Sequence, residues 1–141
     1  MKILLAADGS SYTTKAVDYL VSHFNWFKEG PELHVFHVKA PISDGLARSL
    51  VGHAVLESYY KEESEAALAP AEKLLQKHQL TFKSSYAVGE VSEEIQAYVK
   101  KHKIDLVVMG SHGHGAIKQL IMGSIATRVL ATSSVPVLLV R

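Results

Sequence analysis

The stretch KIDLVVMGSHGHGAIKQLIMGS, residues 103–124, joins an apolar run to a glycine-rich segment and then to the start of a helix. Four glycines lie in it between Met109 and Gly123, counting Gly123 itself. Glycine has no Cβ atom, so a backbone can turn sharply there and approach another group closely. The stretch therefore presents two alternatives: a loop that holds a phosphate, or a loop that only packs against the rest of the protein.

Outward from this stretch, short apolar runs alternate with segments of helical periodicity. The strands are predicted at residues 2–7, 32–40, 80–89, 103–110 and 135–141, and the helices at residues 11–24, about 46–78, 91–102 and 124–131. Strands that alternate with helices form a parallel sheet covered on both faces, with right-handed crossovers. The length of 141 residues suits one domain with one core. We therefore expect a single α/β domain over residues 1–141.

Two of the predicted helices carry local signals. Ser10 and Ser11 are suitable N-caps for the first helix. Pro70 lies inside the second, where the missing N–H group should kink or divide it. The piece before Pro70, with Gly45 and Gly52, is expected to be the most mobile part of the protein.

The ends of two strands indicate where a ligand would bind. The first strand ends at Asp8 and the fourth at Met109 and Gly110. Open parallel sheets bind ligands outside the carboxyl ends of their strands, where the strand order reverses. If these two strands are neighbours, both loops line one crevice.

Composition excludes several classes of protein. The net charge of +1 provides no basic field, so we expect no nucleic-acid partner. The sequence has no cysteine, which excludes a disulfide scaffold, a thiolate metal site and a cysteine nucleophile. The apolar run before Asp8 is too short for the core of a signal peptide, and no later apolar run reaches a membrane-spanning length. These features predict a cytoplasmic protein without membrane insertion.

The residues around Gly123 have the features of an anion site. Gly123 and Ser124 open a helix, whose first N–H groups and partial positive charge favour a phosphate. Gly110 and Gly113 would let the preceding loop fold over the same anion. Glycines after a buried strand also serve as simple turns, so spacing alone leaves both interpretations open.

Two familiar phosphate motifs do not fit. Gly110 and Gly115 have the Walker spacing, but Ala116 stands where the lysine is required. The dinucleotide fingerprint G-x-G-x-x-G comes soon after the first strand. Gly113 and Gly115 instead follow the fourth strand, and no third glycine stands at the required spacing.

The spacing instead resembles the universal stress protein family, whose nucleotide-binding members carry G-x2-G-x9-G-[ST]. Gly110, Gly113, Gly123 and Ser124 fit this pattern. The opening ILLAADGSSYTTKAVDYL, the strand HVFHV and the ending GSIATRVLATSSVPVLLVR are also similar to the family. The resemblance covers the whole chain.

The resemblance implies a five-stranded parallel sheet in the order 3-2-1-4-5, with helices on both faces, and ATP, or related ADP or AMP, in the crevice. Ala7 and Asp8 would contact the nucleotide, Val38 would meet the adenine through its backbone, and Met109 would flank the base or ribose. The ribose and phosphates would be surrounded by the remaining binding residues, Gly110, Ser111, Gly113, His114, Gly123, Ser124 and Ile125.

Asp8 has two interpretations. A carboxylate there can accept hydrogen bonds from ribose hydroxyls or help to hold Mg²⁺ that arrives with the nucleotide. It can also cap the turn DGSS.

His114 and Gly115 depart from the family pattern, which often has Lys or Arg followed by Ser or Thr at these positions. A permanent cation is replaced by a side chain that is mostly neutral at pH 7, and a hydroxyl donor is lost. We therefore expect the affinity for phosphate groups to be weaker, to depend on pH, or to be shifted towards AMP.

The other histidines and the catalytic motifs carry weaker signals. His112 and His114 alone make a poor metal site, so we expect no metal held by the protein alone. His34 and His37 are three residues apart in a strand and should face opposite sides. The sequence has no G-x-S-x-G elbow. We therefore expect no dedicated enzyme and no catalytic residue, with slow ATP hydrolysis as the alternative.

The last predicted strand, residues 135–141, is an apolar sheet edge in this strand order. Pairing with its copy would cover the edge and form the homodimer that the resemblance implies, although a helix or loop could also cover it. The expected mechanism is a nucleotide-dependent change of shape in residues 45–56 and 110–123 that an unknown protein partner reads. A dimeric interaction protein without nucleotide is the rival function.

Overall fold

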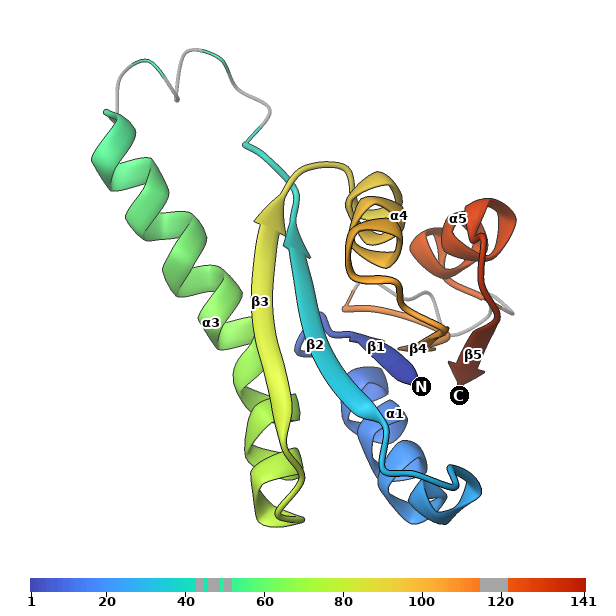
Figure 1. Cartoon of the computed structure of the whole chain (residues 1–141). Helices are drawn as coiled ribbons and strands as arrows, with labels where there is room; N and C mark the ends of the chain where they lie inside the picture. The colour runs from blue at the N-terminus through green and yellow to red at the C-terminus, as the bar shows by residue number, and fades with distance from the viewer. Residues whose placement is uncertain (43–44, 46–48, 50–51, 115–121) are drawn as a thin grey trace.

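The computed structural model describes residues 1–42, 45, 49, 52–114 and 122–141. Five parallel strands form one sheet in the order β3-β2-β1-β4-β5 (Figure 1). They are β1 (Lys2–Ala6), β2 (Glu32–Lys39), β3 (Phe82–Val88), β4 (Leu106–Gly110) and β5 (Val137–Val140). The predicted fold class and strand order are therefore confirmed.

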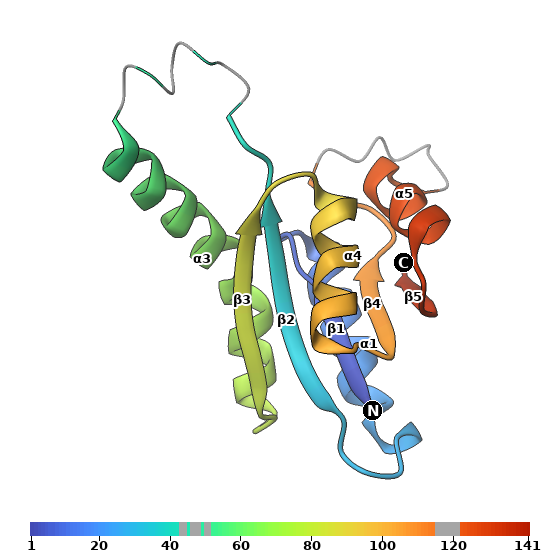
Figure 2. The ribbon, with the colours of Figure 1, turned by 45° about the horizontal axis from the view of Figure 1, so that its top comes forward.

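Helices cover both faces of the sheet (Figure 2). The helix α1 (Ser11–Ser22) and the helix α3 (His53–Lys77) pack on one face, and α4 (Val91–His102) and α5 (Ser124–Thr132) pack on the other. A short 3-10 turn, η1 (Phe24–Trp26), follows α1. No helix in the described residues is both long enough and apolar enough to cross a bilayer.

The central strands β1, β2 and β4 are buried on both faces of the sheet, because each contributes residues to two cores. In β2, Leu33 and Val35 join the core beneath α1 and α3, while Phe36 and Val38 join the core beneath α4 and α5. This alternation follows from the two-residue period of a strand. It assigns consecutive residues of β2 to opposite sides of the sheet, which matters at the site described below.

The start of α1 agrees with its predicted cap, and α4 has a cap that was not predicted from the sequence. Ser10 is the N-cap of α1, and its side chain accepts a hydrogen bond from the Thr13 N–H. Glu90 caps α4 and accepts hydrogen bonds from the N–H of Glu93 and the hydroxyl of Ser92. These bonds, led by the one from Glu93 and joined by one from Arg128, lower the pKa of Glu90 to about 2.

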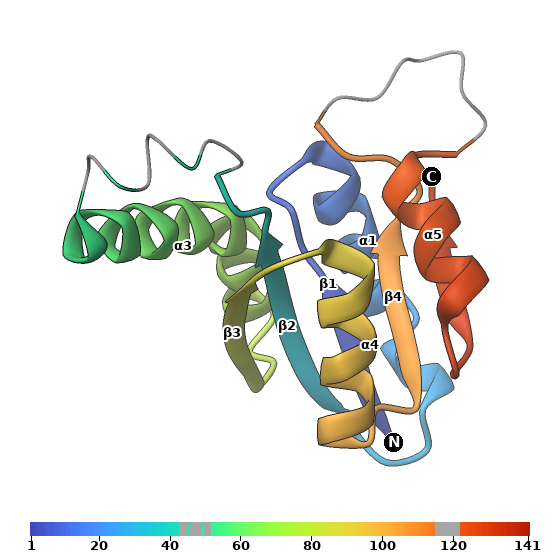
Figure 3. The same ribbon diagram turned by 90° about the horizontal axis from the view of Figure 1, so that it is seen from above.

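The helix α3 decides between the two effects predicted for Pro70, a kink or a division. It runs unbroken through Pro70 for 25 residues, so the proline does not divide it. Figures 2 and 3 show that its two halves run in different directions, as a bend at a proline produces. Burial of Leu68, Ala71 and Leu75 around the proline offsets the lost hydrogen bond. The predicted start near residue 46, and residues 46–48, 50 and 51 of the segment 45–56 predicted to be mobile, lie outside the described residues.

Candidate functional site

A cavity of about 690 Å³ lies at the carboxyl end of the sheet, where the loops after β1 and β4 meet. The strands β1 and β4 are neighbours, and the strand order reverses between them. The prediction that both loops line one crevice is therefore confirmed. Ten of the predicted residues line it, namely Ala7, Asp8, Val38, Met109, Gly110, Gly113, His114, Gly123, Ser124 and Ile125.

Ser111 is the predicted residue that does not line the cavity. It is buried, and its hydroxyl lies 2.9 Å from Nδ1 of His112. Its N–H donates to the Val140 carbonyl at 2.8 Å, and its carbonyl accepts from the Gly123 N–H at 2.8 Å. Ser111 thus ties the loop after β4 to β5 and to the start of α5.

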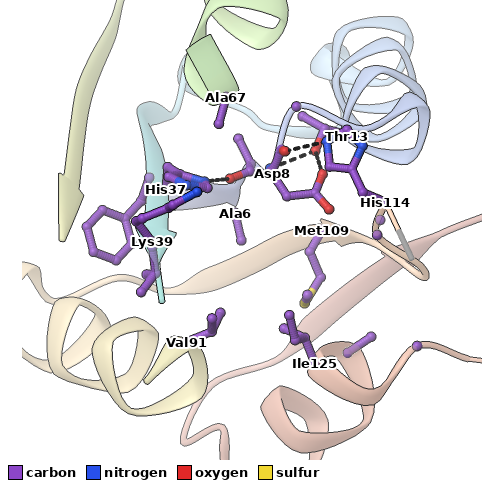
Figure 4. A pocket seen from close by; sticks show the side chains of 18 of the residues that line it. Ala6, Asp8, Thr13, His37, Lys39, Ala67, Val91, Met109, His114 and Ile125 are labelled. Carbon is purple, nitrogen blue, oxygen red and sulfur yellow. Dashed lines mark hydrogen bonds between the residues drawn. The ribbon is translucent and has the colours of Figure 1, made fainter. Parts of the chain in front are cut away.

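The cavity has an apolar side and a polar side (Figure 4). Val91 and Ile125 line it from the direction of α4 and α5, on the same side of the sheet as Val38. His37 and Lys39 line it from the other side of the sheet, together with Glu63, Ala66 and Ala67 of α3. Sequence reasoning missed this polar side. Lys39 adjoins Val38 in the chain, but only the folded structure brings Glu63 to it.

The backbone N–H and C=O of Val38 face the cavity because of the strand register. The Phe36 carbonyl accepts a hydrogen bond from Ala7 N–H of the chain after β1, and the Lys39 carbonyl accepts one from Gly89 after β3. In a parallel strand, alternate residues direct both backbone groups to the same side. The N–H and C=O of Val38 therefore point to the β1 side, just beyond the last residue of β1, Ala6.

Asp8 caps the first turn with one carboxylate oxygen and places the other beside the facing loop. Its Oδ1 accepts from the Ser10 N–H at 2.9 Å and from the Thr13 hydroxyl at 2.7 Å, which is the capping role. Its Oδ2 lies next to Gly113 on the facing loop, 2.7 Å from where a Cβ atom of residue 113 would be. One carboxylate oxygen therefore organises the first turn, and the other lies between the two loops.

His114 links the two loops. Its Nε2–H donates to the backbone carbonyl of Asp8 over 2.8 Å. The residue that replaces a cation in the family pattern is therefore bonded to the loop after β1, at an exposed edge of the cavity. Gly115, the second departure from the pattern, lies outside the described residues.

The three motif glycines each make room for another part of the protein. A Cβ atom on Gly110 would lie 2.5 Å from Cβ of Tyr12 in α1. One on Gly123 would lie 3.3 Å from both the Ser111 carbonyl oxygen and the His112 Cα atom. With Gly113 against Asp8, all three positions allow close approach within the fold. The sequence alternative of a loop packing on the protein is thus present at each of them.

The start of α5 is the part of the site best suited to an anion. Gly123 is the N-cap and supplies no side-chain hydrogen bond. The first N–H groups of a helix have no partner within the helix and carry partial positive charge. Ser124, Ile125 and Ala126 form this first turn and line the cavity.

Lys39 and Glu63 form an ion pair across the rim of the cavity. The Lys39 ammonium donates to a Glu63 carboxylate oxygen over 2.9 Å, and lies 5.4 Å from the centre of the Tyr59 ring. The bond to Glu63 raises the pKa of Lys39. The pair connects the end of β2 to the middle of α3.

The two histidines of β2 lie on opposite faces, as predicted. His34 is 2.9 Å from the Tyr98 hydroxyl of α4, whereas His37 is 2.7 Å from the Ala7 carbonyl and lines the cavity. Within the described residues, no three His, Asp or Glu side chains form a group that could hold a metal ion.

Comparison with known proteins identifies a family for this chain. The sequence model of the universal stress protein family matches residues 1–141. A universal stress protein of Thermus aquaticus is 32% identical over 139 residues, covering 99% of this chain and 97% of that protein. Universal stress protein Slr1230 of Synechocystis is 30% identical over 142 residues; the match covers 99% of this chain and 42% of that longer protein.

Solved structures share the fold. The structure of protein MJ0577 of Methanocaldococcus jannaschii has a TM-score of 0.77 at 24% identity, with 99% of this chain and 94% of that one covered. A universal stress protein in complex with cAMP gives 0.71 at 21% identity, covering 100% and 97%. A universal stress protein from Archaeoglobus fulgidus in complex with dAMP gives 0.71 at 18% identity, covering 100% and 98%.

Proposed function

This chain belongs to the universal stress protein family, and on that premise we propose that it binds ATP, or a related adenine nucleotide, in the cavity between β1 and β4. The observation that carries the proposal is the pairing of two open backbone sites in one cavity. The backbone N–H and C=O of Val38 lie at the β2 side of the cavity, and the start of α5 lies across the cavity from them. The complexes of two structural neighbours with cAMP and with dAMP support this choice of ligand.

The base fits the β2 side of the cavity. Adenine presents an acceptor at N1 beside a donor at N6, which matches the N–H and C=O of Val38. Val91, Ile95 and Met109 provide apolar surface for the ring. An apolar cleft with a few polar groups that fix orientation is the usual form of a small-molecule site.

The phosphates fit the α5 side. The N–H groups of Ser124 and Ile125, in the first turn of α5, and the Ser124 hydroxyl would donate to phosphate oxygens. Asp8 lies between the base side and the phosphate side, so its Oδ2 would accept from a ribose hydroxyl or hold Mg²⁺ that arrives with the nucleotide.

Charge will determine how many phosphates bind well. Among the lining residues that the structure describes, Lys39 carries the permanent cation, and it is already paired with Glu63. The Nε2–H of His114 donates to the Asp8 carbonyl, and a histidine has no permanent charge. We therefore expect Mg²⁺ to matter more for ATP than for AMP.

Beyond the nucleotide, the proposal includes a cytoplasmic, single-domain protein that pairs with its copy through the sheet edge at β5 (Val137–Val140). Parallel strands leave a row of N–H and C=O groups at such an edge, and a second β5 would satisfy them. Nucleotide binding would then change a surface that a protein partner recognises. Size-exclusion chromatography with light scattering tests the dimer independently of the ligand.

The deciding experiment for the ligand has two steps. The purified protein is denatured, and the supernatant is separated by anion exchange against ATP, ADP and AMP standards. The stripped and refolded protein is then titrated with each nucleotide by calorimetry, with and without Mg²⁺. Bound nucleotide or saturable heat supports the proposal. Absence of both in a folded sample contradicts it and favours an interaction protein that binds no nucleotide.

Slow hydrolysis is tested separately. Phosphate release that falls in an Asp8→Ala variant would assign hydrolysis to this cavity. Release that is equal in both proteins points to a contaminating enzyme.

A further inference from the structure

His37 lies at the point where the β1–β2 ladder stops. The register pairs Ala6 with Phe36, and the last rung is the hydrogen bond from Ala7 N–H to the Phe36 carbonyl, at 2.9 Å. In a parallel ladder the next rung would run from Val38 N–H to the Ala7 carbonyl. That carbonyl instead accepts from Nδ1–H of His37 over 2.7 Å.

The imidazole therefore competes with the neighbouring backbone for one acceptor. His37 is 8% exposed, and its side chain lies on the α3 side of the sheet, outside the plane of the ladder. A carbonyl held by this side chain is directed away from Val38, whose N–H then faces the cavity. We propose that His37 is a positioning residue that ends the ladder and keeps the Val38 N–H available to the nucleobase.

This inference rests on the proposed adenine site, where Val38 N–H donates to N1 of the base. It goes further, because it assigns the availability of that donor to a side chain that does not itself touch N1. Without the imidazole, Val38 N–H and the Ala7 carbonyl would pair with each other. The base would then have to break a hydrogen bond in order to form one.

The first test needs no ligand. Amide hydrogen exchange is measured by NMR for Val38 and Phe36 in the wild type, His37→Leu and His37→Asn proteins. Leucine removes the donor, whereas the side-chain amide of asparagine can take the place of Nδ1–H. We expect Val38 to exchange rapidly in the wild type and His37→Asn, and at least about tenfold more slowly in His37→Leu. Equal Val38 exchange in all three proteins would overturn the inference.

The second test uses the ligand. AMP and 1-deaza-AMP, which has C–H in place of N1, are titrated into the same proteins. His37→Leu should weaken AMP by about 3- to 10-fold, the effect of one hydrogen bond, and leave 1-deaza-AMP unchanged. His37→Asn should restore AMP binding. Equal weakening of both ligands would mean that His37 only supports the fold, and would contradict the inference.

The matched control is His34→Leu, a histidine on the same strand that faces away from the cavity. It should lower stability without changing the exchange of Val38 relative to Phe36. If the wild type binds neither nucleotide, the proposed function fails, while the exchange experiment still decides the role of His37.

Discussion

The two ends of the parallel sheet differ in which polar groups have hydrogen-bond partners within the protein. At the amino end, both ring nitrogens of His34 have partners: Tyr98 O–H donates to Nδ1, and Nε2–H donates to Glu32, each over 2.9 Å. Lys83 also donates to Glu32, at 2.6 Å. At the carboxyl end, the Val38 peptide group and the first turn of α5 face a cavity.

The difference shows where the protein uses polar groups for stability and where it keeps them for a ligand. Buried polar groups that are fully paired fix the packing of α4 on β2. Backbone groups without a partner beside a cavity contribute little to stability, but they can form hydrogen bonds with a ligand. The following changes test this distinction, from the largest expected effect to the smallest.

Gly110→Val should disrupt the carboxyl end most severely. The new Cβ would lie 2.5 Å from Cβ and 2.9 Å from the backbone carbonyl carbon of Tyr12, so α1 must move. We expect a loss of about 3 kcal/mol in unfolding free energy, measured by urea denaturation. Gly30→Ala is the control, because its Cβ would meet only a Phe24 ring atom at 3.9 Å. Equal midpoints for both variants would contradict the packing described for Gly110.

Gly123→Val should separate binding from stability. Its Cβ would press on the Ser111 carbonyl and the His112 backbone at 3.3 Å, displacing the start of α5. We expect nucleotide affinity to fall more than about tenfold by calorimetry, against a stability loss of about 1 kcal/mol. Normal affinity in the folded variant would show that the start of α5 does not hold the phosphates.

Tyr98→Phe tests the amino end. It removes the hydroxyl that donates to the buried His34 ring. Leaving a buried acceptor without its donor should cost about 1 to 2 kcal/mol, measured by urea denaturation, while nucleotide affinity stays unchanged. Tyr86→Phe is the control, because that side chain is 39% exposed. A loss of affinity in Tyr98→Phe would mean that the two ends are coupled.

Acid should weaken the amino end through Glu32. Hydrogen bonds from Lys83, and then from His34, lower the pKa of Glu32 from 4.5 to about 2. A carboxyl whose pKa is lower in the folded state adds stability that is complete above pH 4.5 and is lost as the pH falls towards 2. Urea midpoints measured from pH 5 to pH 2.5 should therefore fall less steeply for Glu32→Gln than for the wild type. Parallel profiles would contradict a role for this carboxylate in acid stability.

Most of the architecture was predictable from the sequence because it depends on local patterns. The apolar runs predicted five strands, the Ser10 cap predicted the start of α1, and the glycine spacing predicted the loops that line the cavity. Of the two effects predicted for Pro70, the helix bends and is not divided. Packing of Leu68, Ala71 and Leu75 holds that helix together, and a rule about one residue does not contain this information.

The candidate site divides along the same line. The sequence by itself determined the strand order, through its resemblance to a family, and ten residues that line one cavity. Only the tertiary structure decided that Glu63 meets Lys39, that each motif glycine faces another part of the chain, and that His37 takes the carbonyl which the ladder would use. The physical reason is that these contacts join residues far apart in sequence, and their geometry exists only once the strands and helices have packed.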